Sequence, residues 1–331
     1  MKRLRFLTLP QAAQKALKEI GIAADERGIS AWLVGGMVRD LLLGRPSVDI
    51  DVVVEGHGIA FAGILAQRLG GKFLAHKRFG TAVIDLKENF KIDVVTARRE
   101  TYVRPGVLPD VFPGQISDDL FRRDFTINAV AASLSATSLG EIRDDFDGID
   151  DLEAGLIRIM HYRSFVDDPT RILRAIRYEK RFGFQIEPRT LSALKMACQE
   201  DAFKTITPVR YFNEFRRILE EKDPLPVLRR LRSLDGIRFF VFGPAEERAL
   251  VKIISRQGKA GGLLRCDPNR WHARLAAFML YVDKKKAEEL LLLFSLPRGD
   301  RGKVQNCLSF LQGSDVFNGL QGRKASIVKV R

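Results

Sequence analysis

Short apolar runs and segments with helical spacing alternate along the first hundred residues. An apolar run ends at the pair Gly35-Gly36, and apolar residues spaced about 3.6 apart follow it. This succession indicates a domain that contains both strands and helices. The predicted strands are Ala31–Val34, Val48–Val54, Thr81–Leu86 and Lys91–Thr96, and the predicted helices are Met37–Leu43 and Ile59–Leu69.

Two segments follow the last of these strands. Thr96–Asp110 is rich in Gly, Pro and Arg and has little periodicity, so we expect a mobile loop there. Apolar residues from Phe125 to Val130 lead into a Ser-rich turn, and they predict a final helix that begins near Asp124.

Strand patterns fade after about Asp150, and amphipathic helical patterns replace them. The second half of the chain is therefore predicted to be mostly helical. The predicted helices are Pro169–Arg181, Pro188–Ala197, Val209–Glu221, Pro226–Leu234, Arg270–Val282 and Lys284–Phe294.

The composition excludes several classes of protein. With 46% hydrophobic and 29% charged residues among 331, the chain has enough apolar surface for a folded core. No run reaches the ~18 apolar residues of a membrane span, and the first residues lack the apolar run of a signal peptide. The three cysteines are scattered, without the spacing of a disulfide framework or a zinc site. We therefore expect a cytoplasmic protein.

The net charge of +14 is concentrated in the second half of the chain. Residues 1–200 hold 29 basic and 27 acidic residues, whereas residues 201–331 hold 26 basic and 14 acidic ones. A basic region behind a nearly neutral one favours a polyanionic partner such as nucleic acid. The alternative is a basic surface without a partner.

The Gly35-Gly36 pair ends a predicted strand and opens a predicted helix. Glycines in such a turn allow the backbone to approach a phosphate, and Arg39 adds a fork-shaped donor in the first turn. The spacing matches neither the dinucleotide-binding motif nor the Walker loop. A glycine pair alone is more often a plain turn than a phosphate site.

Three aspartates strengthen the phosphate interpretation. Asp49 and Asp51 are two apart in a predicted strand, so both project from one face beside the glycine turn. Such close carboxylates repel unless cations lie between them, and Mg²⁺ prefers oxygen ligands. Asp93 lies on a strand that could pair alongside and complete a two-metal site. The alternative is three solvated aspartates at strand edges.

These motifs, taken in order, resemble the class II tRNA nucleotidyltransferase and bacterial poly(A) polymerase family. The resemblance extends from about Ala31 to Leu219. Val209 stands where the family's last motif usually has Glu. The matching motifs are Leu33-Val-Gly-Gly-x-Val-Arg-Asp40, Asp49-x-Asp51, Arg122-Arg-Asp-Phe-Thr-Ile-Asn-Ala129, Asp147-Gly-x-x-Asp-Leu152, Asp167-Asp-Pro-x-Arg-x-Leu-Arg-Ala-x-Arg177 and Val209-Arg-x-x-x-Glu-Phe215.

The resemblance implies an α+β fold, with a polymerase-β-like nucleotidyltransferase head of mixed sheet and helices, followed by an all-α neck and body. We expect the head at 1–145, the neck at 146–222 and a basic, tRNA-binding body at 223–331. The implied activity is template-independent addition of C and A from CTP and ATP to the 3′ end of tRNA, with Mg²⁺. Asp49, Asp51 and Asp93 would be catalytic, with the metal on Asp49 and Asp51.

The resemblance also implies how the nucleotide is bound. Asp168 and Arg171 would face the base edge, although Asp168 before Pro169 is also an ordinary helix cap. On a helical wheel, Ile172, Leu173 and Ile176 share one face and the arginines fan over the other. The expected nucleotide-binding residues are Gly35, Gly36, Arg39, Arg123, Asp168, Arg171, Arg174 and Arg177.

The segment Arg98–Asp110 matches the position of the family's flexible loop, which is needed for addition of the terminal A. We therefore expect addition of A, in a CCA-adding or an A-adding enzyme. A CC-adding enzyme, a bacterial poly(A) polymerase and an RNA-binding regulator with an inactive head are the alternatives. The sequence does not indicate an oligomeric state.

Overall fold

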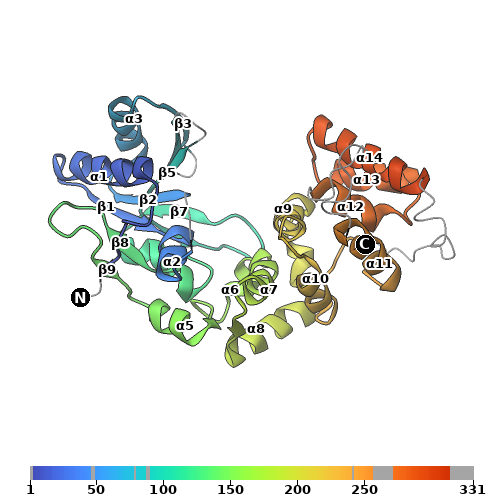
Figure 1. Ribbon diagram of the computed structural model, residues 1–331. Coiled ribbons are helices and arrows are strands. Elements are labelled where there is room, and N and C mark those ends of the chain that lie inside the picture. Colours follow the sequence, from blue (N-terminus) through green and yellow to red (C-terminus); the bar gives the residue numbers. More distant parts are fainter. Residues whose placement is uncertain are drawn as a thin grey trace. The chain divides into compact units, whose positions relative to one another are not determined.

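The structure is a computed structural model, and it describes residues 3–45, 49–77, 80–86, 90–240, 242–255 and 271–313. The chain forms two compact units (Figure 1). The N-terminal unit comprises Met1–Ser164 and Gln185–Thr190, and the C-terminal unit comprises Phe165–Phe184 and Leu191–Arg331. The division into head, neck and body at 145 and 222 stays a prediction.

A mixed sheet of seven strands organises the N-terminal unit, within the described residues. Strands β2 and β5 are parallel, and the other neighbouring pairs are antiparallel. The strand that carries Asp93 thus pairs alongside that of Asp51, as expected, and the pairing is parallel. In spatial order the strands are β3 (Lys72–His76), β4 (Thr81–Asp85), β5 (Lys91–Thr96), β2 (Ile50–Glu55), β1 (Ser30–Val34), β8 (Ala131–Ser133) and β9 (Ile142–Arg143).

Helices α1 (Gln11–Asp25) and α3 (Gly58–Leu69) pack on one side of this sheet, where they share a core with Val52 and Val54 (Figure 1). On the opposite side, Val53 packs in a second cluster with residues of α4 (Ile116–Phe121). Because both faces of β2 are buried at its centre, this strand carries three consecutive valines, Val52–Val54. The remaining elements of the unit are α2 (Gly36–Leu42), α5 (Gly148–Ala154), β6 (Arg98–Thr101), β7 (Asp110–Pro113), β10 (Leu156–Ile157) and β11 (Gln185–Ile186).

Two predictions about the N-terminal unit are wrong. The predicted helix after Asp124 is a 3₁₀ turn, Thr126–Asn128, followed by strand β8. Alanine favours helices, but the buried β8 pairs with β1 on one side and β9 on the other, and these ladders override the local preference. The expected mobile loop contains a hairpin, because β6 pairs with β7 in antiparallel register.

The C-terminal unit is helical in its described part, apart from short turns. An aromatic core holds it together: Phe212 stacks on Phe294 at 4.5 Å, and Phe215 stacks on Phe240 at 5.4 Å between ring centroids. Six helices confirm predicted ones, whereas α6, α11 and α14 were not predicted. The helices are α6 (Ser164–Asp167), α7 (Thr170–Phe182), α8 (Pro188–Gln199), α9 (Pro208–Leu219), α10 (Leu225–Arg232), α11 (Pro244–Ser255), α12 (Trp271–Met279), α13 (Lys284–Leu293) and α14 (Arg298–Gly313).

The cysteines differ in state. Cys198 carries a free thiol, whereas Cys307 is disulfide-bonded. The scattered spacing did not predict this bond. Among the described helices, none is both long and apolar enough to cross a membrane.

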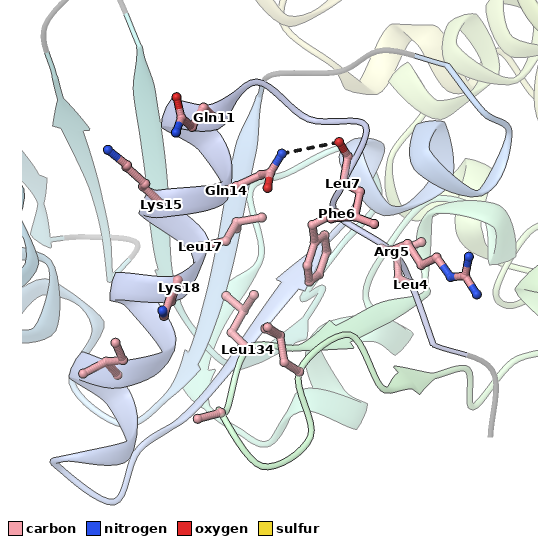
Figure 2. A pocket seen from close by; sticks show the side chains of 13 residues that line it. Leu4, Arg5, Phe6, Leu7, Gln11, Gln14, Lys15, Leu17, Lys18 and Leu134 are labelled. Atoms are coloured by element: carbon pink, nitrogen blue, oxygen red, sulfur yellow. Dashed lines mark hydrogen bonds between the residues drawn. The ribbon is translucent and has the colours of Figure 1, made fainter.

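A groove of about 630 Å³ lies on the N-terminal unit between α1 and the segment that precedes it (Figure 2). Leu4, Phe6 and Leu17 contribute apolar side chains to its wall, and Gln14 donates from Nε2 to the carbonyl of Leu9 at 2.8 Å. None of the predicted site residues lines this groove. The Gly35 turn and the predicted catalytic aspartates therefore lie outside this groove.

Candidate active site

Gly35 connects β1 to α2 in a conformation that excludes larger residues. Its φ is +73°, in the left-handed region where a side chain is strained. A Cβ at this position would lie 2.9 Å from Nη1 of Arg123 and 3.4 Å from Oδ2 of Asp51. The glycine turn, the arginine and the carboxylate therefore meet at one point, as their motifs predicted.

The carboxylates of Asp51 and Asp93 lie side by side. Asp51 on β2 and Asp93 on β5 are register partners in the parallel pair, and Asp49 comes directly before β2. Burial and the charges of Asp93 and Asp49 raise the pKa of Asp51 to about 6, although Arg123 opposes the shift. Burial and the charge of Asp49 also raise the pKa of Asp93. The sequence thus correctly predicted that Asp51 and Asp93 lie together, whereas Asp49, predicted within the strand, comes before it.

The donor set of this site suits a divalent cation. Carboxylate oxygens are the ligands that Mg²⁺ prefers, and mutual repulsion of the three aspartates is relieved by positive charge. Within the described ranges, no group of three or more His, Cys, Asp or Glu side chains is already arranged to enclose an ion. The neighbouring pair Asp51 and Asp93 is therefore the observation that fits a metal, with Asp49 close enough to perturb both.

Arg123 is held at this site by a residue that the sequence reasoning missed. Its Nη2 donates to Oδ2 of Asp119 at 2.9 Å, and its Nη1 contacts the carbonyl of Asn128 at 3.4 Å. Its Nε is buried without a hydrogen-bond partner among the described residues. Burial alone would raise the pKa of the fully buried Asp119, but Arg122 and Arg123 lower it below its usual value. The sequence feature that could have identified Asp119 is its helical spacing from Arg122 and Arg123.

Arg39 is placed differently from the expectation. Its guanidinium is 5% exposed and bonds to Asp40 Oδ1 at 2.8 Å and to Asn128 Oδ1 at 2.6 Å. Asn128 in turn donates to Asp124 at 2.8 Å. Arg39 therefore braces α2 against the turn at Asn128, and its role as a phosphate donor stays a prediction. A Cβ on Gly36 would lie 3.5 Å from this guanidinium.

In the C-terminal unit, three donors converge on one oxygen of Asp168. Oδ1 accepts hydrogen bonds from Thr170 N at 3.0 Å and Thr170 Oγ1 at 2.6 Å, and Nη2 of Arg210 lies 2.9 Å away. No hydrogen bond to Oδ2 is found among the described residues. Asp168 therefore shapes the start of α7 through one oxygen and keeps the other available. Both readings of this residue, cap and recognition group, are compatible with this geometry.

The arginines of α7 are less exposed than the helical wheel suggested. Arg171 and Arg177 are both only 6% exposed. Arg177 pairs with Glu221 at 3.2 Å, and its guanidinium lies over the ring of Tyr178. Arg174 pairs with Glu214 at 3.6 Å and donates to the Tyr178 hydroxyl at 3.1 Å. The arginine face of α7 is therefore largely buried, and acidic and aromatic side chains enclose Arg174 and Arg177.

Helix α9 supplies two of these partners, Arg210 and Glu214. Both belong to the degenerate motif that begins at Val209, and neither was a predicted site residue. Arg210 contacts the recognition candidate Asp168, and Glu214 contacts Arg174 and Arg217. The motif keeps these contacts although Val209 replaces its usual Glu. Only the packing of α9 against α7 makes them visible.

Comparisons with known proteins agree with the fold and with the motifs. A family model described as "Poly A polymerase head domain" matches residues 31–158, and one described as "Probable RNA and SrmB- binding site of polymerase A" matches residues 183–241. An A-adding tRNA nucleotidyltransferase from Halalkalibacterium halodurans is 36% identical over 305 residues, which are 90% of this chain and 69% of that protein. Another, from Geobacter sulfurreducens, is 42% identical over 231 residues, which are 70% of this chain and 26% of that protein.

A solved structure, that of the Thermotoga maritima CCA-adding enzyme complexed with tRNA, matches with a TM-score of 0.74 and 36% identity. The match covers 92% of this chain and 73% of that one. The chain spans only about a quarter of the Geobacter relative (26%). Its similarity to the Halalkalibacterium protein nevertheless covers more than two thirds of that enzyme, and the nucleotidyltransferase head, the helical region and the motifs all agree. The chain therefore belongs to the tRNA nucleotidyltransferase family, and its residues 31–158 match the poly(A) polymerase head domain.

Proposed function

We propose that this protein is a template-independent nucleotidyltransferase that adds A, alone or after C, to the 3′ end of tRNA. The observation that carries the proposal is the pairing of Asp51 with Asp93 beside the Gly35 turn and Arg123. Paired carboxylates next to a backbone turn and a guanidinium are what phosphoryl chemistry requires, because they bind metal ions and triphosphate at one place.

Each residue of the N-terminal unit has a proposed role. Asp49 and Asp51 hold Mg²⁺, and Asp93 completes the site. The bound ions would activate the terminal hydroxyl of the tRNA and stabilise the leaving oxygen. Arg123 binds phosphate oxygens with the guanidinium that Asp119 orients. Gly35 and Gly36 let the backbone come close to the triphosphate.

Selection of the base is proposed for residues of the C-terminal unit. A carboxylate accepts a hydrogen bond from the amino group of cytosine or adenine, and a guanidinium donates to the adjacent ring acceptor. Asp168 and Arg171 supply this pair. Uracil presents a carbonyl where the amino group should be, so the carboxylate repels it. Arg174 and Arg177 support the phosphates or keep α7 in place.

Three observations favour tRNA as the substrate and A as the added nucleotide. The relatives from Halalkalibacterium and Geobacter are A-adding tRNA nucleotidyltransferases. The C-terminal region, 201–331, carries 26 basic against 14 acidic residues, which suits the phosphates of an acceptor stem. The β6–β7 hairpin occupies the place of the loop expected for addition of A.

Incubation of three tRNAs with CTP and ATP, added separately, tests the proposal. The first tRNA lacks CCA, the second ends in CC, and the third ends in the complete CCA. We expect ATP to extend the tRNA that ends in CC by one nucleotide, with a requirement for Mg²⁺. Extension of the first tRNA by CTP would identify a CCA-adding enzyme, and its absence an A-adding one. If ATP leaves the CC-ended tRNA unextended, A addition is excluded.

The same assay separates the alternatives. A bacterial poly(A) polymerase would extend oligo(A) primers processively, and an RNA-binding regulator would bind tRNA without extending it. The regulator is disfavoured because Asp49, Asp51 and Asp93 are all present. The expected cytoplasmic location stays a prediction.

A further inference from the structure

Glu100 lies at the centre of a buried charge cluster on the hairpin. From strand β6, its Oε1 accepts hydrogen bonds from Nη2 of Arg98 at 2.8 Å and Nη1 of Arg122 at 3.3 Å. Its Oε2 accepts one from the hydroxyl of Tyr102 at 3.3 Å. The Glu100 side chain is only 7% exposed, so it depends on these partners rather than on water.

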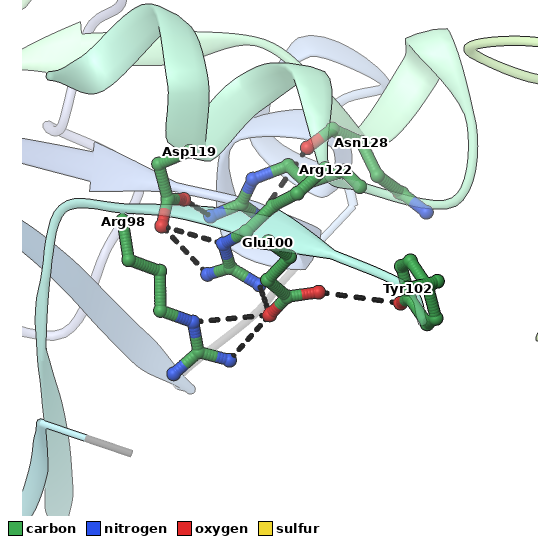
Figure 3. Close-up of polar contacts among 7 residues, drawn as sticks. Arg98, Glu100, Tyr102, Asp119, Arg122 and Asn128 are labelled. Atoms are coloured by element: carbon green, nitrogen blue, oxygen red, sulfur yellow. Dashed lines mark hydrogen bonds and ion pairs between the residues drawn. The ribbon is translucent and has the colours of Figure 1, made fainter. Parts of the chain in front are cut away.

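The cluster continues from the hairpin through Arg122 to Asp119 (Figure 3). Arg122 donates to Oδ1 of Asp119 from Nη2 at 2.6 Å and from Nε at 2.9 Å. The other oxygen of Asp119 accepts from Arg123 at 2.9 Å. Asp119 therefore bridges Arg122 and Arg123, and Glu100 bridges Arg122 to Arg98 and Tyr102. Tyr102, Glu100, Arg122, Asp119 and Arg123 form what we call the ion-pair relay.

The relay ends inside the candidate active site. The guanidinium of Arg123 lies next to Gly35: a Cβ on Gly35 would be 2.9 Å from its Nη1. At the other end, Glu100 lies on strand β6 of the hairpin, and Tyr102 directly follows that strand. Asp119 is fully buried, and buried carboxylates and guanidinium groups keep their partners because separation leaves a charge without compensation. A displacement of Glu100 must therefore be followed by Arg122, Asp119 and Arg123.

We infer that Glu100 is a positioning residue, which couples the place of the β6–β7 hairpin to the orientation of Arg123 toward the nucleotide triphosphate. This inference rests on the proposed function, and it adds a physical route by which the hairpin acts on the nucleotide site without touching the nucleotide. The hairpin then sets the affinity for the incoming nucleotide, and the tRNA-binding surface is unaffected.

A double-mutant cycle tests the coupling. The variants are Glu100→Gln, Arg123→Ala and the double variant, and ATP affinity is measured by calorimetry with Mg²⁺ and without tRNA. We expect Glu100→Gln to weaken ATP binding at least about fivefold in the wild-type background and less than about twofold in the Arg123→Ala background. KM for ATP on a CC-ended tRNA should rise in parallel, while kcat changes less.

Asp118→Asn is the matched control. Asp118 is also a carboxylate of α4, but it accepts from the backbone N–H of Gln115 and lies outside the relay. This variant should bind ATP like the wild type. Equal losses for Glu100→Gln in both Arg123 backgrounds, or unchanged ATP binding, overturn the inference.

A milder variant protects the test against misfolding. If Glu100→Gln does not fold, Tyr102→Phe replaces it in the cycle, because it removes a single hydroxyl from the relay. Tyr102→Phe should then weaken ATP binding less than Glu100→Gln would, and again only when Arg123 is present. If the loss of ATP affinity does not depend on Arg123, the relay is refuted. Wild-type protein that binds ATP but extends no tRNA refutes the proposed function while the binding cycle still decides the inference. Wild-type protein that binds no ATP refutes both.

Discussion

Replacement of Asp168 by Asn should exchange the base preference without unfolding the protein. Three donors from Thr170 and Arg210 converge on Oδ1 of Asp168. In Asp168→Asn, these donors hold the amide oxygen in the same place, and the amide nitrogen then replaces Oδ2. A donor thereby stands where the proposed recognition group accepts a hydrogen bond.

The size of the effect follows from the groups that change. Loss of one hydrogen bond to the amino group of A or C, and gain of one to the carbonyl of U, are each worth about 1.5 kcal/mol. The combined change of about 3 kcal/mol corresponds to a roughly 150-fold shift in preference toward UTP. The lost charge weakens the ion pair with Arg210. The side chain of Arg210 is 23% exposed, and that of Asp168 is 20% exposed. For such a pair the loss of stability is at most about 1 kcal/mol.

The assay measures kcat/KM for ATP, CTP, UTP and GTP and compares the four values. The substrates are a tRNA that ends in CC and a tRNA that lacks CCA. Thermal melts of the same protein preparations report their stability. Asp168→Ser is the matched control, because its hydroxyl can still accept from Thr170 but places nothing at the position of Oδ2. It should lose discrimination without gaining a preference for UTP. If Asp168→Asn melts like the wild type and keeps the wild-type base preference, the recognition role is refuted. If both variants fail to fold, the cap is the principal role of Asp168.

Three further predictions concern the metal site, the basic region and the buried acid. Asp51→Asn should abolish nucleotide addition in a primer-extension gel and leave tRNA affinity in a filter-binding assay nearly unchanged, because metal chemistry and phosphate binding rest on different residues; equal loss of binding would contradict this. The affinity for tRNA should fall steeply with salt and be similar for an acceptor minihelix, measured by fluorescence anisotropy, because the excess charge of 201–331 can reach only phosphates and duplex shape; a flat salt dependence counts against it. Asp119→Ala should lower the free energy of unfolding by roughly 3 kcal/mol at neutral pH, since it leaves Arg122 and Arg123 without their shared carboxylate. Because the folded-state pKa of Asp119 is lowered, its contribution is present above the unfolded pKa of about 3.9 and is lost as the pH falls through the folded pKa, so denaturant titrations of the two proteins should converge at low pH.

Local patterns carried much of the fold and the centre of the site. Strand β5 has the predicted bounds, and α3 and α13 lie within a residue of theirs, because buried residues alternate along β5 and recur at helical spacing along the two helices. The glycine turn and Asp51 were also visible, since their spacing within one strand–turn–helix unit already fixes which groups face the same space.

Other elements depend on partners far away in the sequence. Residues 131–133 look helical by composition and form a strand because β1 and β9 lie on either side. The segment 98–113 looks like a loop and pairs as a hairpin. The backbone hydrogen bonds of residues 131–133 thus come partly from β1, far earlier in the chain, whereas β6 pairs with β7 at the other end of the same segment. In both cases the strand pairing outweighs the local preference.

The sequence by itself therefore determined the kind of chemistry, through Asp49, Asp51, Asp93 and the order of the motifs. Only the tertiary structure decided which charged groups act together: Asp119 with Arg123, and Asp168 with Arg210. The physical reason is that a spacing of two or four residues fixes direction along one strand or helix, whereas an ion pair between two helices depends on how they pack. Burial then makes those pairings obligatory, because a buried charge without its partner is strongly destabilising.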